Sequence, residues 1–436
     1  MSTIPNGSTP LAEEPPRTRK NVLARLSVMM LLQYATFGAW WATFGLVLIT
    51  NNLGATIGTA FTLAAVAAMV SPLFTGAIAD RYFSSQKVLG VLHIGGGLVM
   101  LVLGPLVLAQ NAVGVLVAIL VYMLIFMPTG SLTSSIVFAH LPAHSTIFPF
   151  IRAFGTAGWI IVGLFVGQSG LSASTTIFTI AGVMSFVTAI YCFTLPKTAP
   201  PQRGAKFAWG DVVGAGAFHL FRNRSFVILT VSILLVSVPI SIYNAFGAAY
   251  LGVAGVPNVA SVMTIGQAAE LAFLVLVPLV LRRFSIKSVL LAGLLAWVLR
   301  AGLFLMMTDG NLSLAIVIVA LHGVTNDFFL MVTFIYANEV ARENARHQVQ
   351  ALMLFIAFGV GNFVGAWVAG EFYNSLVAGA VSVAGWAPMW YLTMALTGFA
   401  AVLMVLFFRS PERKRIEDFP AETLAPLLGD ESTRRI

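Results

Sequence analysis

The stretch ASVMTIGQAAELAFLVLVPLVL (residues 260–281) decides the fold class, because it is largely apolar and has only one charged side chain, a carboxylate. A run of about 20 apolar residues is long enough to cross roughly 30 Å of hydrocarbon as a helix. The exception is Glu270, which lies in the middle of the run. A charge is costly inside a membrane, so we expect this residue to have either a partner or a function.

The composition of the whole chain also indicates a membrane protein. Of the 436 residues, 58% are hydrophobic and 9% are charged, whereas soluble domains have about 25% charged residues. Similar apolar runs recur along most of the sequence, and they lack the short alternating pattern of a membrane β-barrel. The chain has one cysteine, Cys192, and therefore neither an internal disulfide nor a CxxC metal pattern. We expect an all-α integral membrane protein with no metal and no cofactor.

Twelve membrane-spanning helices are predicted. Their approximate ranges are 26–49, 55–79, 88–109, 113–138, 149–171, 174–195, 225–251, 258–281, 288–308, 312–338, 347–370 and 387–408. The residues before the first helix are polar and contain prolines, and they lack the apolar core of a signal peptide. We expect them to form a cytoplasmic tail.

The basic residues predict how these helices are oriented. Of the 24 Lys and Arg residues, all except Arg152 and Arg300 lie in the two tails or in the loops after the predicted helices 2, 6, 8 and 10. This is the positive-inside pattern, which places both termini in the cytoplasm and requires an even number of helices. The net charge of +8 is thus a topology signal, and we expect no nucleic-acid partner.

A long polar segment, residues 196–224, divides the predicted helices into six plus six. The loops DRYFSSQKVL and RRFSIKSVLL occupy equivalent places in the two halves and share Arg, aromatic, Lys and Val-Leu residues, which indicates related halves. The expected organisation is a tail (1–25), a six-helix bundle (26–195), a cytoplasmic linker (196–224), a second bundle (225–408) and a cytoplasmic tail (409–436).

Four ionisable side chains other than histidines lie well inside the predicted helices: Arg152, Glu270, Arg300 and Asp327. Their charges sum to zero, so two buried ion pairs would be the simplest explanation. Gln267 precedes Glu270 by three residues and shares its helix face. That pair offers donors and acceptors to a polar, uncharged ligand with hydroxyl groups; the alternative is a structural contact with a neighbouring helix.

Asp327 lies near the middle of the predicted helix 312–338. A membrane carboxylate of this kind can bind and release a proton as its surroundings change between wet and dry, so proton coupling or ligand contact is one interpretation. The alternative is a fixed ion pair with Arg300 on the preceding helix. For Arg300 itself we favour a structural role as the partner of a carboxylate.

Arg152, Thr156 and Trp159 lie at spacings of four and three, which places them on one side of the predicted helix 149–171. An aromatic ring beside hydroxyl and guanidinium donors suits a ligand that stacks and forms hydrogen bonds. Phe328, which follows Asp327, is a further candidate for stacking. We expect His93 to be a hydrogen-bonded core residue, and His322, five residues before Asp327, to lie on a different face from it.

Several motifs resemble known families. GAIADRYFSSQK (76–87) resembles the loop signature of the major facilitator superfamily, in which Asp80 and Arg81 are structural charges. LQYATFGAWW, PFIRAFGTAGW, GQAAELAF, AWVLRAGLF and NDFF, in this order over roughly 25–410, resemble the bacterial nucleoside–proton symporter family. Two departures are Ser241, where characterised members have glutamine, and Asn326, where they have an aromatic residue. Both positions are expected to face the substrate.

The resemblance implies a major facilitator fold of two six-helix bundles and secondary active, proton-coupled nucleoside uptake by alternating access. The alternative is a transporter of another small polar solute, such as a sugar, a metabolite or a drug. We expect no enzymatic activity, a monomer in the lipid bilayer, and a multi-pass protein of the bacterial inner membrane. The implied substrate contacts are Arg152, Thr156, Trp159, Asn244, Gln267, Glu270, Asp327 and Phe328, with Asp327 and Glu270 as proton carriers.

Overall fold

The computed structural model describes residues 16–74, 83–141, 147–199, 214–341 and 345–410. Within these ranges, twelve helical segments are long and apolar enough to cross a membrane. Asp80 and Arg81 lie outside the described residues, as do residues 200–213 of the expected linker and most of the two tails. The prediction of twelve spans is confirmed.

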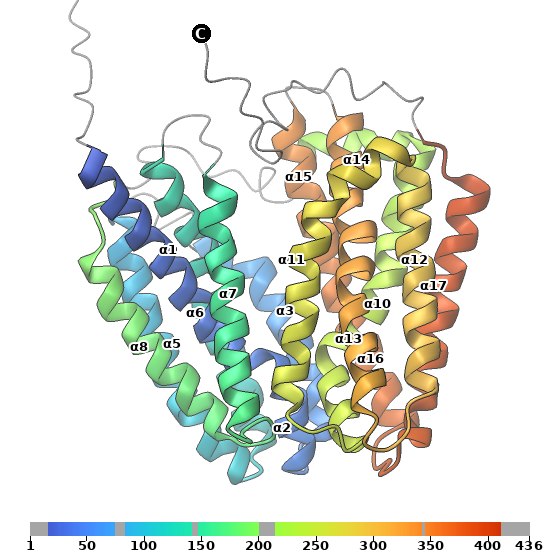
Figure 1. Cartoon of the computed structure of the whole chain (residues 1–436), viewed down its shortest axis with the longest axis horizontal. Helices are drawn as coiled ribbons and strands as arrows, with labels where there is room; N and C mark the ends of the chain where they lie inside the picture. The colour runs from blue at the N-terminus through green and yellow to red at the C-terminus, as the bar shows by residue number, and fades with distance from the viewer. Residues whose placement is uncertain (1–15, 75–82, 142–146, 200–213, 342–344, 411–436) are drawn as a thin grey trace, which may run out of the picture.

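The first group of helices comes from the N-terminal half and lies on the left in Figure 1. Its segments are α1 (Pro16–Gly38), η1 (Trp41–Thr43), α2 (Phe44–Thr50), η2 (Gly54–Thr56), α3 (Ile57–Phe74), α5 (Ser85–Leu108), α6 (Ala112–Ala139), α7 (Phe148–Gln168) and α8 (Thr176–Thr194). The first span is thus not the continuous helix we predicted, because the short 3-10 segment η1 separates α1 from α2.

The second group comes from the C-terminal half and lies on the right in Figure 1. Its segments are η4 (Ala215–Arg222), α10 (Arg224–Val253), α11 (Val259–Arg283), α12 (Ile286–Leu305), α13 (Leu312–Asn326), η5 (Asp327–Met331), α14 (Val332–Val340), α15 (Arg346–Leu354), η7 (Phe355–Gly361), α16 (Asn362–Leu376), η8 (Val383–Trp386) and α17 (Ala387–Phe407). Helices form because lipid offers the backbone no hydrogen-bond partners, so every N–H and C=O must be satisfied within the segment.

Two of these spans contain a π-helical turn, η5 in the tenth span and η7 in the eleventh. A π-turn adds a residue to the turn of a helix and often marks a functional site. Asp327 is the first residue of η5, and η7 ends at Gly361. Both turns lie at mid-span, so they change which side chains face the centre of the second group.

The two groups pack against each other at the lower end of Figure 1. Gly58 on α3 lies against Gly370 on α16, and a Cβ atom on Gly370 would come within 2.6 Å of the Gly58 Cα. The hydroxyl of Ser261 on α11 donates to the carbonyl of Leu164 on α7 (3.3 Å), and the amide N–H of Ala260 donates to the hydroxyl of Ser172 (3.1 Å). Small residues allow such close packing of membrane helices.

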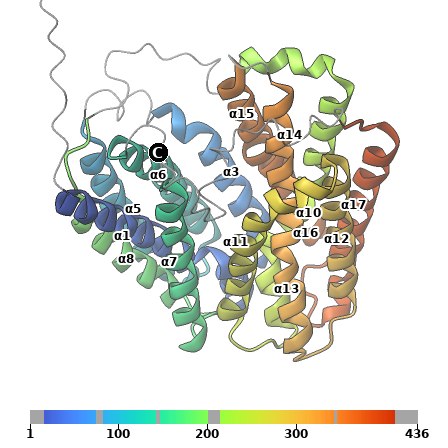
Figure 2. The ribbon, with the colours of Figure 1, turned by 45° about the horizontal axis from the view of Figure 1, so that its top comes forward.

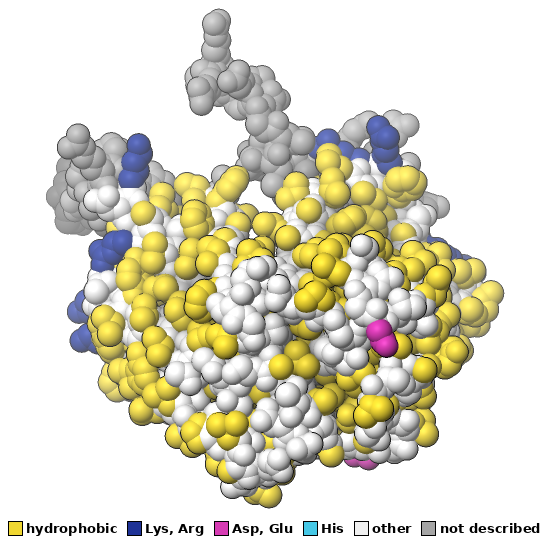
Figure 3. Space-filling view, turned by 60° about the horizontal axis from the view of Figure 1, so that its bottom comes forward, with side chains coloured by type: hydrophobic (Ala, Val, Ile, Leu, Met, Phe, Trp, Pro, Cys, Tyr) yellow, Lys and Arg dark blue, Asp and Glu magenta, His cyan; other side chains and the backbone are white. Residues whose placement is uncertain are grey.

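The contacts at this end join the start of α3 to the end of α16, and the end of α7 to the start of α11. The opposite end carries the first residues of α1 and the end of α17. In Figure 3, the face that is turned forward shows mostly apolar side chains with a few acidic ones, whereas Lys and Arg lie along the upper and side margins. The two halves are therefore closed at the end away from these basic residues.

Candidate functional site

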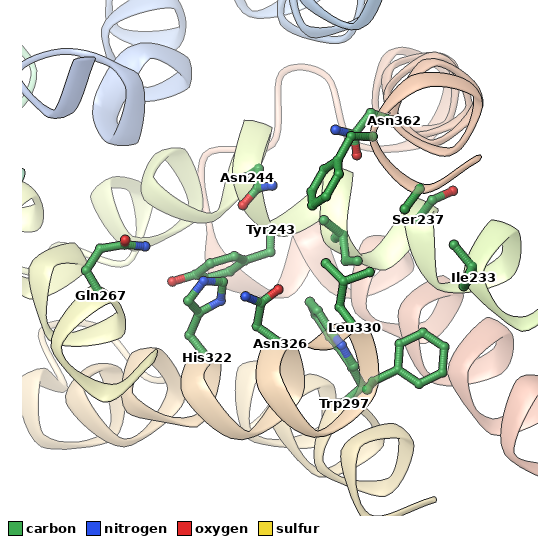
Figure 4. A pocket seen from close by; sticks show the side chains of 14 residues that line it. Ile233, Ser237, Tyr243, Asn244, Gln267, Trp297, His322, Asn326, Leu330 and Asn362 are labelled. Atoms are coloured by element: carbon green, nitrogen blue, oxygen red, sulfur yellow. The ribbon is translucent and has the colours of Figure 1, made fainter. Parts of the chain in front are cut away.

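A cavity of about 790 Å³, including its open part, lies within the second group of helices. The side chains around it come from α10, α11, α12, α13, η5, η7 and α16 (Figure 4). They are Ile233, Ser237, Ile240, Tyr243, Asn244, Gln267, Trp297, His322, Asn326, Phe329, Leu330, Ala357, Phe358 and Asn362. Of the expected substrate contacts, Asn244 and Gln267 lie in this wall.

Glu270 is not itself a lining residue, but it contacts three polar side chains that line this cavity. Asn326 Nδ2 donates to its Oε1 at 3.0 Å, and Gln267 Nε2 donates to its Oε2 at 3.4 Å. The third neighbour is His322, whose Nε2 lies 3.5 Å from the same Oε2. The Glu270 side chain is still 34% exposed, so its carboxylate has room for a further donor.

His322 contributes more to this site than its sequence position indicated. Its ring stacks on Tyr243, with the ring centres 5.1 Å apart, and both rings line the cavity. His322 and Asn326 are four residues apart on α13 and both reach Glu270 on α11. This spacing of four is the sequence signal that places the two side chains on one helix face.

Asp327 is buried, with 2% of its surface exposed, and does not line the cavity. Its Oδ2 atom has no hydrogen-bond partner among the described residues. The adjacent Phe328 is half-buried and packs edge-on against Phe273 on α11, with the ring centres 5.8 Å apart. Phe328 is therefore in contact with a neighbouring helix and not in the cavity wall, where the next residue, Phe329, is found.

Arg300 is completely buried on α12. Its Nε donates to the carbonyl of Ile318 at 2.8 Å, and its Cζ lies 3.7 Å from the centre of the Tyr243 ring. Both terminal nitrogens lack a hydrogen-bond partner among the described residues. The expected partnership with a carboxylate, including the alternative ion pair with Asp327, is thus wrong in this structure. A cation packed on an aromatic face takes its place.

The candidates from the N-terminal half form a separate cluster. Arg152 on α7 lies over the Tyr34 ring, with Cζ 4.1 Å from its centre. Trp159, two turns further along α7, packs edge-on against Phe37 with ring centres 5.5 Å apart. Both side chains and that of Thr156 are half-buried, and none of them lines the cavity of the C-terminal half.

A second polar cluster lies inside the N-terminal half. The Gln33 amide contacts the hydroxyl of Thr129 and the Nε2 of His93, each at 2.6 Å. The other ring nitrogen of His93 lies 3.1 Å from the Ser185 hydroxyl. His93 and Gln33 are both buried, which confirms the prediction of a hydrogen-bonded core histidine. Gln33 holds α1 to its neighbours and is not in the cavity wall.

The two residues that differ from the family pattern, Asn326 and Ser241, lie in different surroundings. Asn326 lines the cavity, as expected. Ser241 does not: it is 5% exposed and faces α16, where a Cβ on Gly365 would come within 2.6 Å of its hydroxyl. The small side chain therefore permits close packing of α10 on α16. No cluster of three or more potential metal ligands occurs among the described residues.

The family model described as nucleoside H⁺ symporter matches residues 20–413. The chain belongs to this family. It is 32% identical over 406 residues to the putative nucleoside transporter YegT of Escherichia coli (strain K12), covering 90% of this chain and 95% of the relative. The xanthosine permease of the same organism is 28% identical over 412 residues, with 89% and 95% covered. The chain is accordingly a multi-pass inner-membrane transporter that couples nucleoside uptake to protons, and not an enzyme.

Solved structures support the fold. A crystal structure of a mutant of the nucleoside transporter NupG has a TM-score of 0.82 at 24% identity, covering 89% of this chain and 100% of that one. The D-xylose-proton symporter has a TM-score of 0.64 at 15% identity, with 91% and 99% covered. The major facilitator fold of the prediction is thus confirmed.

Proposed function

We propose that the cavity is the C-terminal half of a nucleoside site, with Glu270 behind three of its polar lining residues. The observation that carries this proposal is the convergence of Gln267, His322 and Asn326 on one partly exposed carboxylate, at 3.0–3.5 Å. A carboxylate accepts hydrogen bonds from hydroxyl groups, and bonds to a charged group are stronger than neutral ones. The ribose hydroxyls of a nucleoside would meet this requirement, whereas a phosphate group would be repelled.

The nucleobase would lie further into the cavity, between aromatic and carboxamide groups. Tyr243, Trp297 and Phe329 provide ring surfaces in the wall, and Asn244 and Asn362 provide donors and acceptors. Apolar walls with a few placed polar groups are typical of small-molecule sites. This composition favours an uncharged, ring-containing solute.

For proton coupling we propose Asp327. It is the carboxyl group buried beside the cavity wall, and its Oδ2 has no partner among the described residues. An uncompensated charge in such a place is costly, so the group is suited to take up a proton in a dry state and to release it when water enters. Glu270 is a second candidate, since its carboxylate contacts the histidine.

The other half of the site would come from Arg152, Thr156 and Trp159 on α7. In alternating access, two repeats rock around a site between them, and α7 already contacts α11, the helix that carries Glu270. We propose that residues 26–195 and 225–408 are the two rocking units, with 196–224 as the linker. The tails 1–25 and 409–436 would lie in the cytoplasm, and the protein would act as a monomer in the bilayer.

Transport by proteoliposomes tests this function. An inward proton gradient should drive accumulation of labelled uridine and adenosine, and a protonophore should abolish it. Excess unlabelled nucleoside should compete with the label, whereas sugars should not. Gradient-driven uptake of a sugar, with no uptake of any nucleoside, would overturn the proposal.

A further inference from the structure

The segment that leads from the linker into the second group is a short helix on the surface of the molecule. This helix, η4 (Ala215–Arg222), precedes α10 and is seen in light green at the top of Figure 2, beside α15. It lies at the end of the molecule that carries the basic residues, where the membrane span of α10 begins at Arg224. Its position therefore corresponds to the membrane surface.

One side of η4 is fixed to α15. Gly214 begins the segment with φ +65°, and a side chain there would meet the carbonyl of Gln348 and the N–H of Leu352. The conformation and the close approach both require glycine. Ala217 and Leu220 are buried on the same side. Movement of η4 would thus be transmitted to α15.

The exposed edges of η4, together with the start of α10, are aromatic and basic. Phe218 and Phe221 are 51% and 40% exposed, and their rings pack edge-on at 6.2 Å between centres. Arg222 and Arg224 are also exposed, and Arg224 lies over the ring of Phe407 at the end of α17, 5.0 Å from its centre. Aromatic and basic residues together are typical of protein surfaces at the membrane–water boundary.

We propose that this surface, formed by η4 and the start of α10, binds the headgroups of anionic phospholipids. The rings of Phe218 and Phe221 would enter the boundary of the acyl chains, and Arg222 and Arg224 would contact the phosphates. Each basic residue near a negatively charged membrane surface strengthens binding about fivefold. Lipid is the occupant because the exposed face is continuous with the lipid-facing surface of α17, where Leu406 is 65% exposed.

Binding at this surface would reach the transport site through one connected element. The end of η4 that touches Gln348 and Leu352 contacts α15, and α15 continues directly into the π-turn η7. Ala357 and Phe358 of η7 line the cavity. Anionic lipid held on η4 would therefore restrain the cytoplasmic end of the eleventh span, and with it one wall of the cavity.

The position of η4 is tested with a spin label. Cys192 is the only cysteine of the chain and is buried, so Cys192→Ser provides a background for single labels. A nitroxide attached at Phe218→Cys in vesicles should collide more often with oxygen than with a water-soluble nickel chelate. The ratio of the two collision rates should approach that of a label at Phe399→Cys, which lies on the exposed face of α17. If the label at Phe218→Cys collides with the nickel chelate as often as a label at the exposed loop position Asp309→Cys does, the surface faces water and the proposal is overturned.

The charges are tested by lipid composition. Wild-type uptake in phosphatidylcholine vesicles should rise severalfold when phosphatidylglycerol is added, and R222Q/R224Q should lose this rise. R222K/R224K should restore it, and Lys197→Gln, which removes an exposed charge elsewhere on the same side, should retain it. An equal response in R222Q/R224Q and wild type would overturn the proposal. The label experiment needs no transport, so its result is independent of the proposed function.

Discussion

His322 lies against Glu270, with the imidazole Nε2 3.5 Å from the carboxylate Oε2. The two residues come from α13 and α11, and the contact places a titratable ring beside the carboxylate that we propose for the ribose. His322 is also stacked on Tyr243, so its orientation is fixed from a third helix.

His322→Phe should keep the stacking on Tyr243 and remove the donor that faces Glu270. Loss of one hydrogen bond to a charged group corresponds to about a tenfold weaker affinity if the network holds Glu270 in its binding orientation. Calorimetry of nucleoside binding to the purified protein measures this change in affinity. His322→Gln retains a donor and should lose less. Equal affinity of wild type and His322→Phe would contradict the proposed role of the contact.

Glu270→Gln should reduce nucleoside affinity by about tenfold or more, because a neutral amide accepts a weaker hydrogen bond than a carboxylate. The amide is nearly isosteric, so the fold should be retained. Glu371→Gln changes an exposed carboxylate near the end of α16 and serves as the matched control, which should bind as the wild type does. Unchanged affinity in Glu270→Gln across several pH values would assign Glu270 to helix packing.

Asp327→Asn should separate binding from proton coupling. The amide cannot gain or lose a proton at the pH values used for transport. Because Asp327 does not line the cavity, nucleoside binding should change by less than about threefold. Gradient-driven accumulation should be lost, while exchange of internal for external nucleoside should continue. The two assays use the same vesicles with and without a proton gradient. Full gradient dependence in the variant would exclude Asp327 as the proton carrier.

Gly370→Val should hinder the contact between the two halves. A side chain there would meet Gly58 within 2.6 Å of its Cα, and backbone atoms cannot move aside as the end of a flexible side chain can. We expect slower uptake, since closure at this end requires the contact, and a raised exposure of this end to labelling reagents. Gly302→Val, at a glycine with open space around it, is the control. Normal uptake in Gly370→Val would refute the closed end seen here.

The helices followed from the sequence because each of them depends on local properties. The predicted range 258–281 and the observed α11 (Val259–Arg283) differ by at most two residues at either end, since an apolar run has to match the thickness of the bilayer. The break at η1 was missed because Trp41 and its neighbours remain apolar through it. Hydrophobicity does not distinguish a 3-10 turn from a helix.

The sequence by itself determined that Glu270, Arg300 and Asp327 are charges placed within the membrane, because their positions inside apolar spans leave no other environment. Only the tertiary structure decided what each of them touches: Glu270 contacts His322 and Asn326, and Arg300 contacts Tyr243. Spacing along one helix fixes which side chains share a face. The contact partner on a neighbouring helix depends on the rotation and tilt of that helix, and here also on the π-turn that begins at Asp327.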